Sequence, residues 1–358
     1  PLVSEAENAI YKLSISNGTI DEYEQFVKKY PNNRNASDAW RTLYYISTKN
    51  YTTDDLEQFK LKYPDFPHKY LLLRDLESIK SKYYPIVSNG KWGFIDSKGN
   101  VTVPCLYDWV DEFTEGFAGC TFNEKNGFID GGGKVVIPFH YDHVEGFKQG
   151  IAIVEKGNKY GIINKRGKDV VPFDYDEISD FSEGYAVIGY HDKYGYINNK
   201  GNIIIPTIYS QAEDFHEGVA LVKVNDKFGY IDTLGRQLTP TTYDWAGNFE
   251  NGMAKVQVNN KYCIINTKGD TILKCEFDLL GDFSEGAIIV VKDDKYGFAD
   301  TAGKIIIPIE YDFSDRSLLS LKFKNNTTIG EKNKKQRIIN KSGKPVNKIE
   351  FSRVQLFN

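Results

Sequence analysis

The stretch Lys159–Gly184, KYGIINKRGKDVVPFDYDEISDFSEG, decides the fold, because its signals return about every 34 residues along most of the chain. Each copy carries a glycine, usually after an aromatic residue, and Cys263 replaces that glycine once. A fixed period of this length is typical of tandem repeats, whose units bury their apolar faces against their neighbours. The glycines are Gly93, Gly127, Gly161, Gly195, Gly229 and Gly297.

Each unit is predicted to form three short strands. Alternating runs such as 185–188 and 160–163 predict the first two strands, and an apolar run ending at proline, such as 135–138, predicts the third. Between the second and third strands stands an Asp or Asn with a Gly three residues later, which indicates a hairpin turn closed by a left-handed glycine. The pairs are Asp96/Gly99, Asp130/Gly133, Asn164/Gly167, Asn198/Gly201, Asp232/Gly235, Asn266/Gly269, Asp300/Gly303 and Asn340/Gly343.

The alternation within the second strand predicts which side chains are buried. One isoleucine per unit keeps a single register and is expected in the core, while lysines cluster at the turns. The repeated glycine lies two residues earlier on the same face, where it lets a neighbouring aromatic ring or backbone approach closely. The isoleucines are Ile95, Ile129, Ile163, Ile197, Ile231 and Ile265.

Residues 1–83 have a different, helical period. Residues 19–26 match residues 52–59 at an offset of 33, and each copy starts with a threonine that is expected to cap a helix. Two further helices are predicted at about 36–48 and 68–82. This arrangement of helix pairs is similar to tetratricopeptide repeats, and the pattern at 24–31 resembles helical repeats of bacterial envelope proteins.

From Tyr84 the β units begin, and here the resemblance is specific. Lys91-Trp92-Gly93 followed by Phe94-Ile95-Asp96, a later glycine, Val-x-Pro and Tyr-Asp resembles the bacterial WG (KWG) repeat family. The resemblance covers roughly 84–352 and implies a tandem all-β fold, mostly without an assigned activity. Only Trp92 retains the family's tryptophan.

The sequence therefore predicts a small helical segment at 1–83 and a β-repeat domain at 84–358. We expect eight three-stranded units, the last of them degenerate, with a polar insertion at 324–335. The helices at one end and the degenerate unit at the other are expected to act as caps. Because only an open array needs caps at its ends, we favour an open superhelix over a closed propeller.

Composition excludes some partners. The net charge is −4 with a pI of about 5.9 and interspersed signs, so no nucleic-acid partner is expected. No apolar run is long enough to span a membrane. Because the sequence starts at Pro1, a signal peptide or lipid anchor upstream stays open.

Three further kinds of site have simpler explanations. The Asp/Asn-x-x-Gly turns offer oxygen ligands for calcium, but four of the eight carry Asn and the hairpin explanation is favoured. His140 and His143, with His191 or His216, suit a metal, but surface scatter is favoured. Buried free thiols are favoured over disulfides for the four cysteines, although Cys105 and Cys120 could be neighbours. The remaining cysteines are Cys263 and Cys275. No cofactor is expected.

Trp109 and Trp245 are the candidate contact residues. Each lies two residues after the corner tyrosine, at a position that varies among the other units, so an exposed side chain is expected there. Exposed aromatic side chains suit a peptide or glycan surface. The alternative is that both rings simply cover the corner.

The predicted function is a non-enzymatic bacterial scaffold or binding protein that presents an extended repeat surface to a protein or peptide. A carbohydrate-binding module of the cell envelope is the first alternative, and a hydrolase is the second, because a glycosidase would need two carboxyl groups at a defined separation. The expected location is the bacterial cell envelope, periplasmic or surface-exposed, with the cytoplasm as the alternative.

Overall fold

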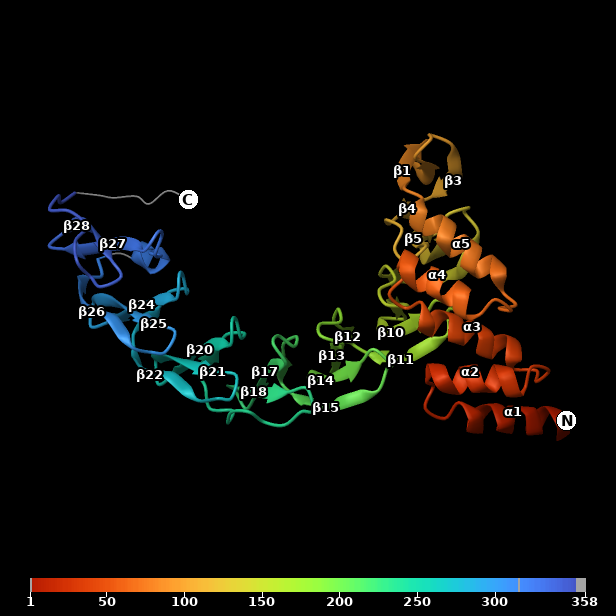
Figure 1. Ribbon diagram of the computed structural model, residues 1–358, viewed down its shortest axis with the longest axis horizontal. Coiled ribbons are helices and arrows are strands. Elements are labelled where there is room, and N and C mark those ends of the chain that lie inside the picture. Colours follow the sequence, from red (N-terminus) through yellow and green to blue (C-terminus); the bar gives the residue numbers. More distant parts are fainter. Residues whose placement is uncertain (1, 315, 352–358) are drawn as a thin grey trace. The chain divides into compact units, whose positions relative to one another are not determined.

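A computed structural model describes residues 2–314 and 316–351 of the chain (Figure 1). The chain divides into two compact units, Pro1–Ile178 and Ser179–Asn358. The helices and the first β units thus share one compact unit, and the predicted boundary at residue 83 falls inside it. The described part of the chain contains no helix that is long and apolar enough to cross a membrane.

Five helices occur in the described part of the first unit, one more than the sequence pattern predicts. The additional helix is α1, and its Ile10 and Tyr11 pack against the helical core. Thr19 and Thr52 cap their helices as predicted, since each hydroxyl accepts a hydrogen bond from the backbone N–H three residues later. The helices are α1 (Leu2–Ser14), α2 (Ile20–Lys29), α3 (Ala36–Ser47), α4 (Thr53–Lys62) and α5 (Lys69–Lys80).

Antiparallel sheets follow the helices in chain order. Each sheet pairs strands that are neighbours in sequence, in the order β1-β2-β3, β4-β5-β6-β7 and β8-β9-β10-β11. The strands of the first unit are β1 (Tyr83–Ser88), β2 (Lys91–Asp96), β3 (Val101–Tyr107), β4 (Trp109–Val110), β5 (Phe117–Phe122), β6 (Lys125–Asp130), β7 (Val135–Tyr141), β8 (His143–Val144), β9 (Ile151–Lys156), β10 (Lys159–Asn164), β11 (Asp169–Tyr175) and β12 (Glu177–Ile178).

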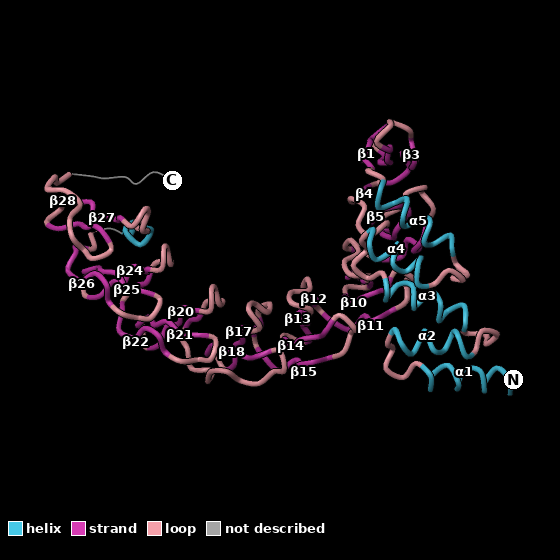
Figure 2. The backbone as a smooth tube through the Cα atoms, in the orientation of Figure 1, coloured by secondary structure: helices cyan, strands magenta, loops and turns pink. Residues whose placement is uncertain are grey.

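The second unit repeats the pattern, and its sheets succeed one another in a row (Figure 2). The mainly β tandem-repeat fold with an α-helical N-terminal segment is therefore as predicted. Most sheets contain four strands rather than the predicted three, because the corner after a third strand adds a two-residue strand to the next sheet. The strands are β13 (Tyr185–Tyr190), β14 (Lys193–Asn198), β15 (Ile203–Tyr209), β16 (Gln211–Ala212), β17 (Val219–Val224), β18 (Lys227–Asp232), β19 (Trp245–Ala246), β20 (Met253–Val258), β21 (Lys261–Asn266), β22 (Thr271–Phe277), β23 (Leu279–Leu280), β24 (Ala287–Lys292), β25 (Lys295–Asp300), β26 (Ile305–Asp312), β27 (Thr327–Lys332) and β28 (Lys335–Asn340).

The predicted insertion in the last unit is misplaced. Residues 327–332 form strand β27 and pair with β28, so the polar stretch at 324–335 is largely a regular hairpin. The additional residues lie earlier, around the short 3₁₀ helix Arg316–Ser320. The polar composition of this stretch favours a loop, but the hairpin forms because Ile329 and Ile339 are buried within it.

The hairpin turns form as predicted. Asp96 Oδ1 accepts hydrogen bonds from the backbone N–H groups of Lys98 and Asn100, at 2.8 and 2.9 Å, and Gly99 has a φ of +84°. Asp or Asn in the other units makes the same bonds. The carboxylate or amide oxygen is thus occupied by its own turn, which explains these residues without a calcium ion.

The isoleucine register is buried as predicted except in the first unit. Ile129 packs with Phe94 and Val103 of the preceding sheet, and Ile163 packs with Phe128 in the same way. Ile95 is only half-buried, because no β unit precedes it. The prediction of a single core face is too narrow: Phe94 and Phe128 lie on the opposite face and are also fully buried, since each inner sheet is covered on both sides.

The repeated glycine permits close approach of the third strand. A Cβ atom at Gly93 or Gly127 would lie closer than 3.0 Å to the carbonyl oxygen of Val103 or Ile137. The third strand bulges at this point, where the register shifts between successive pairs. The predicted close backbone approach is confirmed.

Cys263 replaces that glycine and forms a disulfide with Cys275, 12 residues later on the third strand. The prediction of free thiols is therefore wrong for this pair. The reason is geometric: the glycine position faces the third strand at short range, so a cysteine there meets a second one. Cys105 and Cys120 are free, and Cys120 is buried.

Two carboxylates per typical unit tie neighbouring units together. Asp142, in the corner after β7, pairs with Lys125 and accepts a hydrogen bond from Gly157 N–H of the next hairpin at 2.6 Å. The glutamate of the Glu-Gly turn accepts from two backbone N–H groups one unit further on, as Glu183 does from Glu217 and Gly218 at 2.9 and 2.8 Å. These bonds give the Tyr-Asp and Glu-Gly signals a structural role.

Candidate functional site

The corner positions place both predicted tryptophans at the surface. Trp109 is the first residue of β4 and is 53% exposed, and Trp245 is the first residue of β19 and is 42% exposed. The neighbouring position in each corner, Val110 or Ala246, is buried. The expected exposure of this repeat position is confirmed for both residues.

The two indole rings have different aromatic partners. Trp109 packs edge-to-face against Trp92 with ring centroids 5.3 Å apart, and its indole N–H donates to Asp111 Oδ1 at 3.1 Å. Trp245 packs edge-to-face against Tyr262, at 6.0 Å. Trp92 and Tyr262 occupy the same repeat position, but Trp92 precedes its partner in the chain and Tyr262 follows it. Each corner thus presents a pair of aromatic rings, one of them well exposed.

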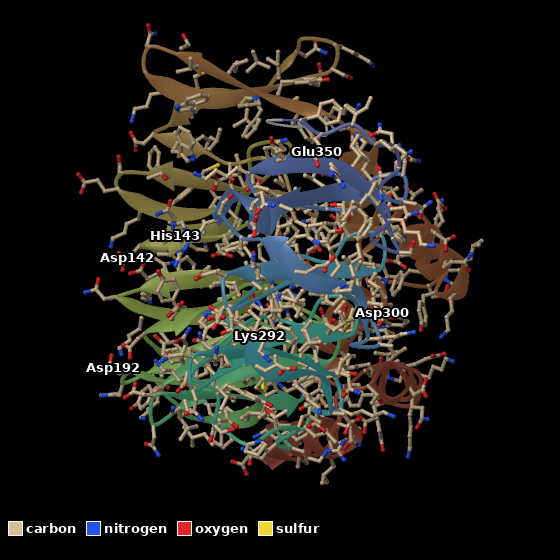
Figure 3. The ribbon with its side chains drawn as sticks, turned by 90° about the vertical axis from the view of Figure 1, so that its left-hand side faces the viewer. Asp142, His143, Asp192, Lys292, Asp300 and Glu350 are labelled. Atoms are coloured by element: carbon tan, nitrogen blue, oxygen red, sulfur yellow. A yellow bond between two sulfur atoms is a disulfide. The ribbon has the colours of Figure 1, made fainter. Side chains whose placement is uncertain are left out.

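The histidines do not form the metal site that the sequence offered as an alternative. The ring of His140 on β7 lies tilted against that of Tyr141, with centroids 4.2 Å apart, and partial burial lowers the pKa of its imidazole. Asp142 and His143 lie at the rim of the repeat (Figure 3). Across residues 2–314 and 316–351, no three His, Cys, Asp or Glu side chains come together in a way that could hold a metal ion.

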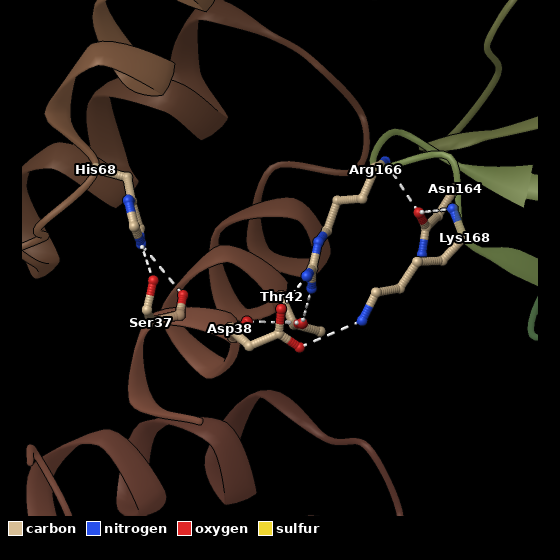
Figure 4. Close-up of polar contacts among 7 residues, drawn as sticks. All are labelled: Ser37, Asp38, Thr42, His68, Asn164, Arg166 and Lys168. Carbon is tan, nitrogen blue, oxygen red and sulfur yellow. Dashed lines mark hydrogen bonds and ion pairs between the residues drawn. The ribbon is translucent and has the colours of Figure 1, made fainter. Parts of the chain in front are cut away.

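A polar junction between the helical segment and the β turns was missed by the sequence reasoning. Arg166 and Lys168, in the turn after β10, both pair with Asp38 on α3, and Arg166 also donates to Thr42 at 3.3 Å (Figure 4). Asn164 holds this turn through hydrogen bonds from the backbone N–H groups of Arg166 and Lys168. The available signal was the local excess of basic residues in this turn.

Lys165, in the same turn, is buried at this junction. Its ammonium lies 3.1 Å from Glu115 Oε2, donates to the Glu115 carbonyl at 3.0 Å, and stands 3.9 Å from the ring centroid of Tyr51. Burial lowers the pKa of the Lys165 ammonium. A cation–π contact and one carboxylate stabilise the charge that burial penalises.

A second buried carboxylate lies on the helical side. Asp75 on α5 is fully buried, accepts a hydrogen bond from the Tyr44 hydroxyl at 2.7 Å, and pairs with Arg74 at 2.7 Å. The Arg74 guanidinium also stands 4.9 Å from the ring centroid of Phe117, the first residue of β5. The junction therefore combines buried charges from helix α5 and from the turns of the repeats.

Comparisons with known proteins agree with the repeat assignment. The family model described as "WG containing repeat" matches residues 92–125, 127–160, 160–194, 194–228, 228–262, 264–296 and 296–315. No curated protein matches the sequence.

Similar solved structures share little sequence with this chain. The crystal structure of a eukaryotic initiation factor has 10% identity and a TM-score of 0.34, covering 76% of this chain and 96% of that one. Hsv2 of Kluyveromyces lactis has 9% identity and a TM-score of 0.29, covering 63% and 87%. The extracellular domain of BT3049, a putative hybrid two-component system of B. thetaiotaomicron, has 9% identity and a TM-score of 0.24, covering 75% and 50%.

Proposed function

Because the chain belongs to the family of WG containing repeat proteins, we propose that it is a non-enzymatic binding protein that presents its repeat surface to a protein or peptide partner. The observation that carries this proposal is the pair of exposed tryptophans at one repeat position, Trp109 and Trp245. Tryptophan is enriched where interfaces concentrate their binding energy. Neither indole is needed to close the core beneath it, since Val110 and Ala246 do so.

The repeat scaffold supports this role. Backbone groups are paired within short antiparallel sheets, and the inner faces are filled by neighbouring units, so the corner side chains remain available for recognition. A rigid aromatic ring on such a corner loses little conformational freedom on binding. Each corner is thus a preorganised contact point.

We further propose that the protein functions in the bacterial cell envelope. The Cys263–Cys275 disulfide supports this location, because disulfides persist in oxidising compartments and are rare in the cytosol.

The test is capture of a partner from a bacterial envelope fraction by immobilised protein. The double variant Trp109→Ala/Trp245→Ala should lose most of the capture and keep its melting temperature. Tyr84→Ala is the matched control, because Tyr84 is an equally exposed aromatic residue away from the corners. Undiminished capture by the double variant would reject the corners as the binding surface.

A parallel titration separates the carbohydrate alternative. In this experiment, oligosaccharides are added while tryptophan fluorescence is measured. Quenching in the wild type but not in the double variant would favour a glycan ligand over a peptide partner.

A further inference from the structure

The first compact unit contains a pocket of about 310 Å³ between helices α3 and α5, the start of β7 with the turn before it, and the turn after β10. This volume is at the lower end of the range for small-molecule sites. Its lining is strongly cationic. The charged lining residues are Arg41, Arg74, Lys134, Lys165, Arg166 and Lys168.

Carboxylates neutralise only part of this charge. Asp75 pairs with Arg74, Glu115 with Lys165, and Asp38 is shared by Arg166 and Lys168. Six cations therefore face three carboxylates. Among the residues that the structure describes, Arg41 and Lys134 have no carboxylate within ion-pair distance.

Arg41 supplies a second, independent sign of a missing partner. Its Nε atom is buried and has no hydrogen-bond partner in the described part of the chain. Buried donors of this kind are rarely left unpaired, because losing water without gaining an acceptor costs about 1–3 kcal/mol. An anion in the pocket would provide the acceptor.

The remaining walls are aromatic and aliphatic. Tyr45 and Tyr70 contribute rings from the two helices, while Leu71 and Val136 contribute apolar surface. Tyr70 is half-exposed and lies at the surface, so a ligand body has a ring to pack against near the solvent. A ligand that fits this pocket combines a compact anionic head with an apolar or aromatic body.

We propose that this pocket binds a small organic phosphate monoester, with the phosphate held by Arg41 and Lys134 and the organic body against Tyr45 and Tyr70. A phosphate monoester carries about −1.5 to −2 charges at pH 7, which matches the two cations without carboxylate partners. The guanidinium of Arg41 suits the oxygens of a phosphate geometrically, and Lys134 adds a flexible point charge.

The placement gives the ligand a structural consequence. Arg41 lies on α3 and Lys134 lies in the turn before β7, so a bound phosphate bridges the helical segment and the repeats. Burial lowers the pKa of the Lys165 ammonium, and a dianion bound nearby would raise that pKa again. This site lies on different elements from the Trp109 corner and is independent of the proposed partner surface.

The test is isothermal titration calorimetry of the full chain with phenyl phosphate and with inorganic phosphate. The wild type should bind phenyl phosphate more tightly than inorganic phosphate, because the ring gains contacts with the tyrosines. Arg41→Gln and Lys134→Gln should each weaken phenyl phosphate binding by about tenfold, the effect of losing one charge-assisted hydrogen bond.

Lys304→Gln is the matched control. Lys304 follows the turn glycine of its unit, as Lys134 does, but it lies in the second compact unit and lines no part of this pocket. Its substitution should leave the affinity unchanged. Lys134 is exposed, so Lys134→Gln keeps the proposal testable even if Arg41→Gln fails to fold.

Three outcomes would overturn the proposal. They are no heat of binding for phenyl phosphate, equal affinity for inorganic and phenyl phosphate, and equal weakening by Lys134→Gln and Lys304→Gln.

Discussion

Lys165 and Lys341 occupy the same repeat position in two units but lie in different surroundings. Each donates to the backbone carbonyl of a Glu-Gly turn, Glu115 at 3.0 Å or Glu285 at 2.7 Å. The side chain of Lys165 is 4% exposed and that of Lys341 is 38% exposed. The ammonium lies 3.1 Å from the Glu115 carboxylate in the first case and 3.8 Å from that of Glu285 in the second.

The difference comes from what covers each lysine. Tyr51 of the helical segment lies over the Lys165 ammonium. Lys341 is exposed, and its ammonium lies 5.7 Å from the ring centroid of Phe323. The repeat pattern thus determines which backbone carbonyl the lysine at this position bonds. The neighbouring element decides whether the ion pair is a surface contact or a buried one.

Substitution of the two lysines tests this comparison directly. Lys165→Met should lower the free energy of unfolding by about 3–5 kcal/mol, because it leaves the largely buried carboxylate of Glu115 without its cation. Lys341→Met should cost less than about 1 kcal/mol, as expected for an exposed pair. Urea unfolding followed by circular dichroism measures both, and equal losses would contradict the assigned burial.

The isoleucine register gives a second matched pair. Ile163→Ala should cost about 2–5 kcal/mol, because the side chain is fully enclosed between two sheets. Ile95→Ala should cost clearly less, since the first unit has no β unit in front of it and Ile95 is half-buried. Thermal and urea unfolding of both variants give the comparison, and a larger loss for Ile95→Ala would refute the stacking order.

The disulfide extends the comparison to the glycine position. Cys263→Ala/Cys275→Ala should lower stability by about 2–4 kcal/mol, because the unfolded chain loses a cross-link. Titration of thiols in denaturant should find two free groups, Cys105 and Cys120, in the wild type. Four reactive thiols in protein purified from an oxidising compartment would contradict the bond.

The smallest effect is expected for the partly exposed Asp142, whose bonds link neighbouring units. Its hydrogen bonds from Lys125 and Gly157 lower the pKa of the carboxyl. A carboxyl with a lowered folded-state pKa stabilises the fold above its unfolded pKa of about 3.9, and this contribution is lost as the pH falls through the lower folded value. Asp142→Asn should therefore be less stable than wild type at neutral pH.

The gap between these two proteins should close towards acid pH, which urea midpoints measured from pH 7 downward would show. A gap that stays constant over this range would mean that the charge of Asp142 contributes nothing.

Much of the fold was predictable because its causes are local. The Asp or Asn of each turn bonds its own backbone, as Asp96 does, and Thr19 and Thr52 bond the first turn of their helices. The exposure of Trp109 and Trp245 was predictable for a related reason. A position that varies among otherwise similar units is free of the packing that the repeat imposes.

The cationic pocket and the polar junction beside it could not be predicted in this way. Arg166 and Asp38 meet across 128 residues, a separation unrelated to the repeat period. Likewise, the residues around Cys263 do not indicate that its partner is Cys275. The two cysteines meet because the third strand bulges towards the position of Cys263.

The sequence by itself therefore determined the repeat unit, its turns, its isoleucine register and four of the five helices, since each depends on contacts within one unit or between adjacent ones. Only the tertiary structure decided which basic residues became buried, which cysteines bonded, and where a cationic pocket opened. Those outcomes depend on which element covers a given repeat position, and the burial of a charge is set by that cover rather than by its neighbours along the chain.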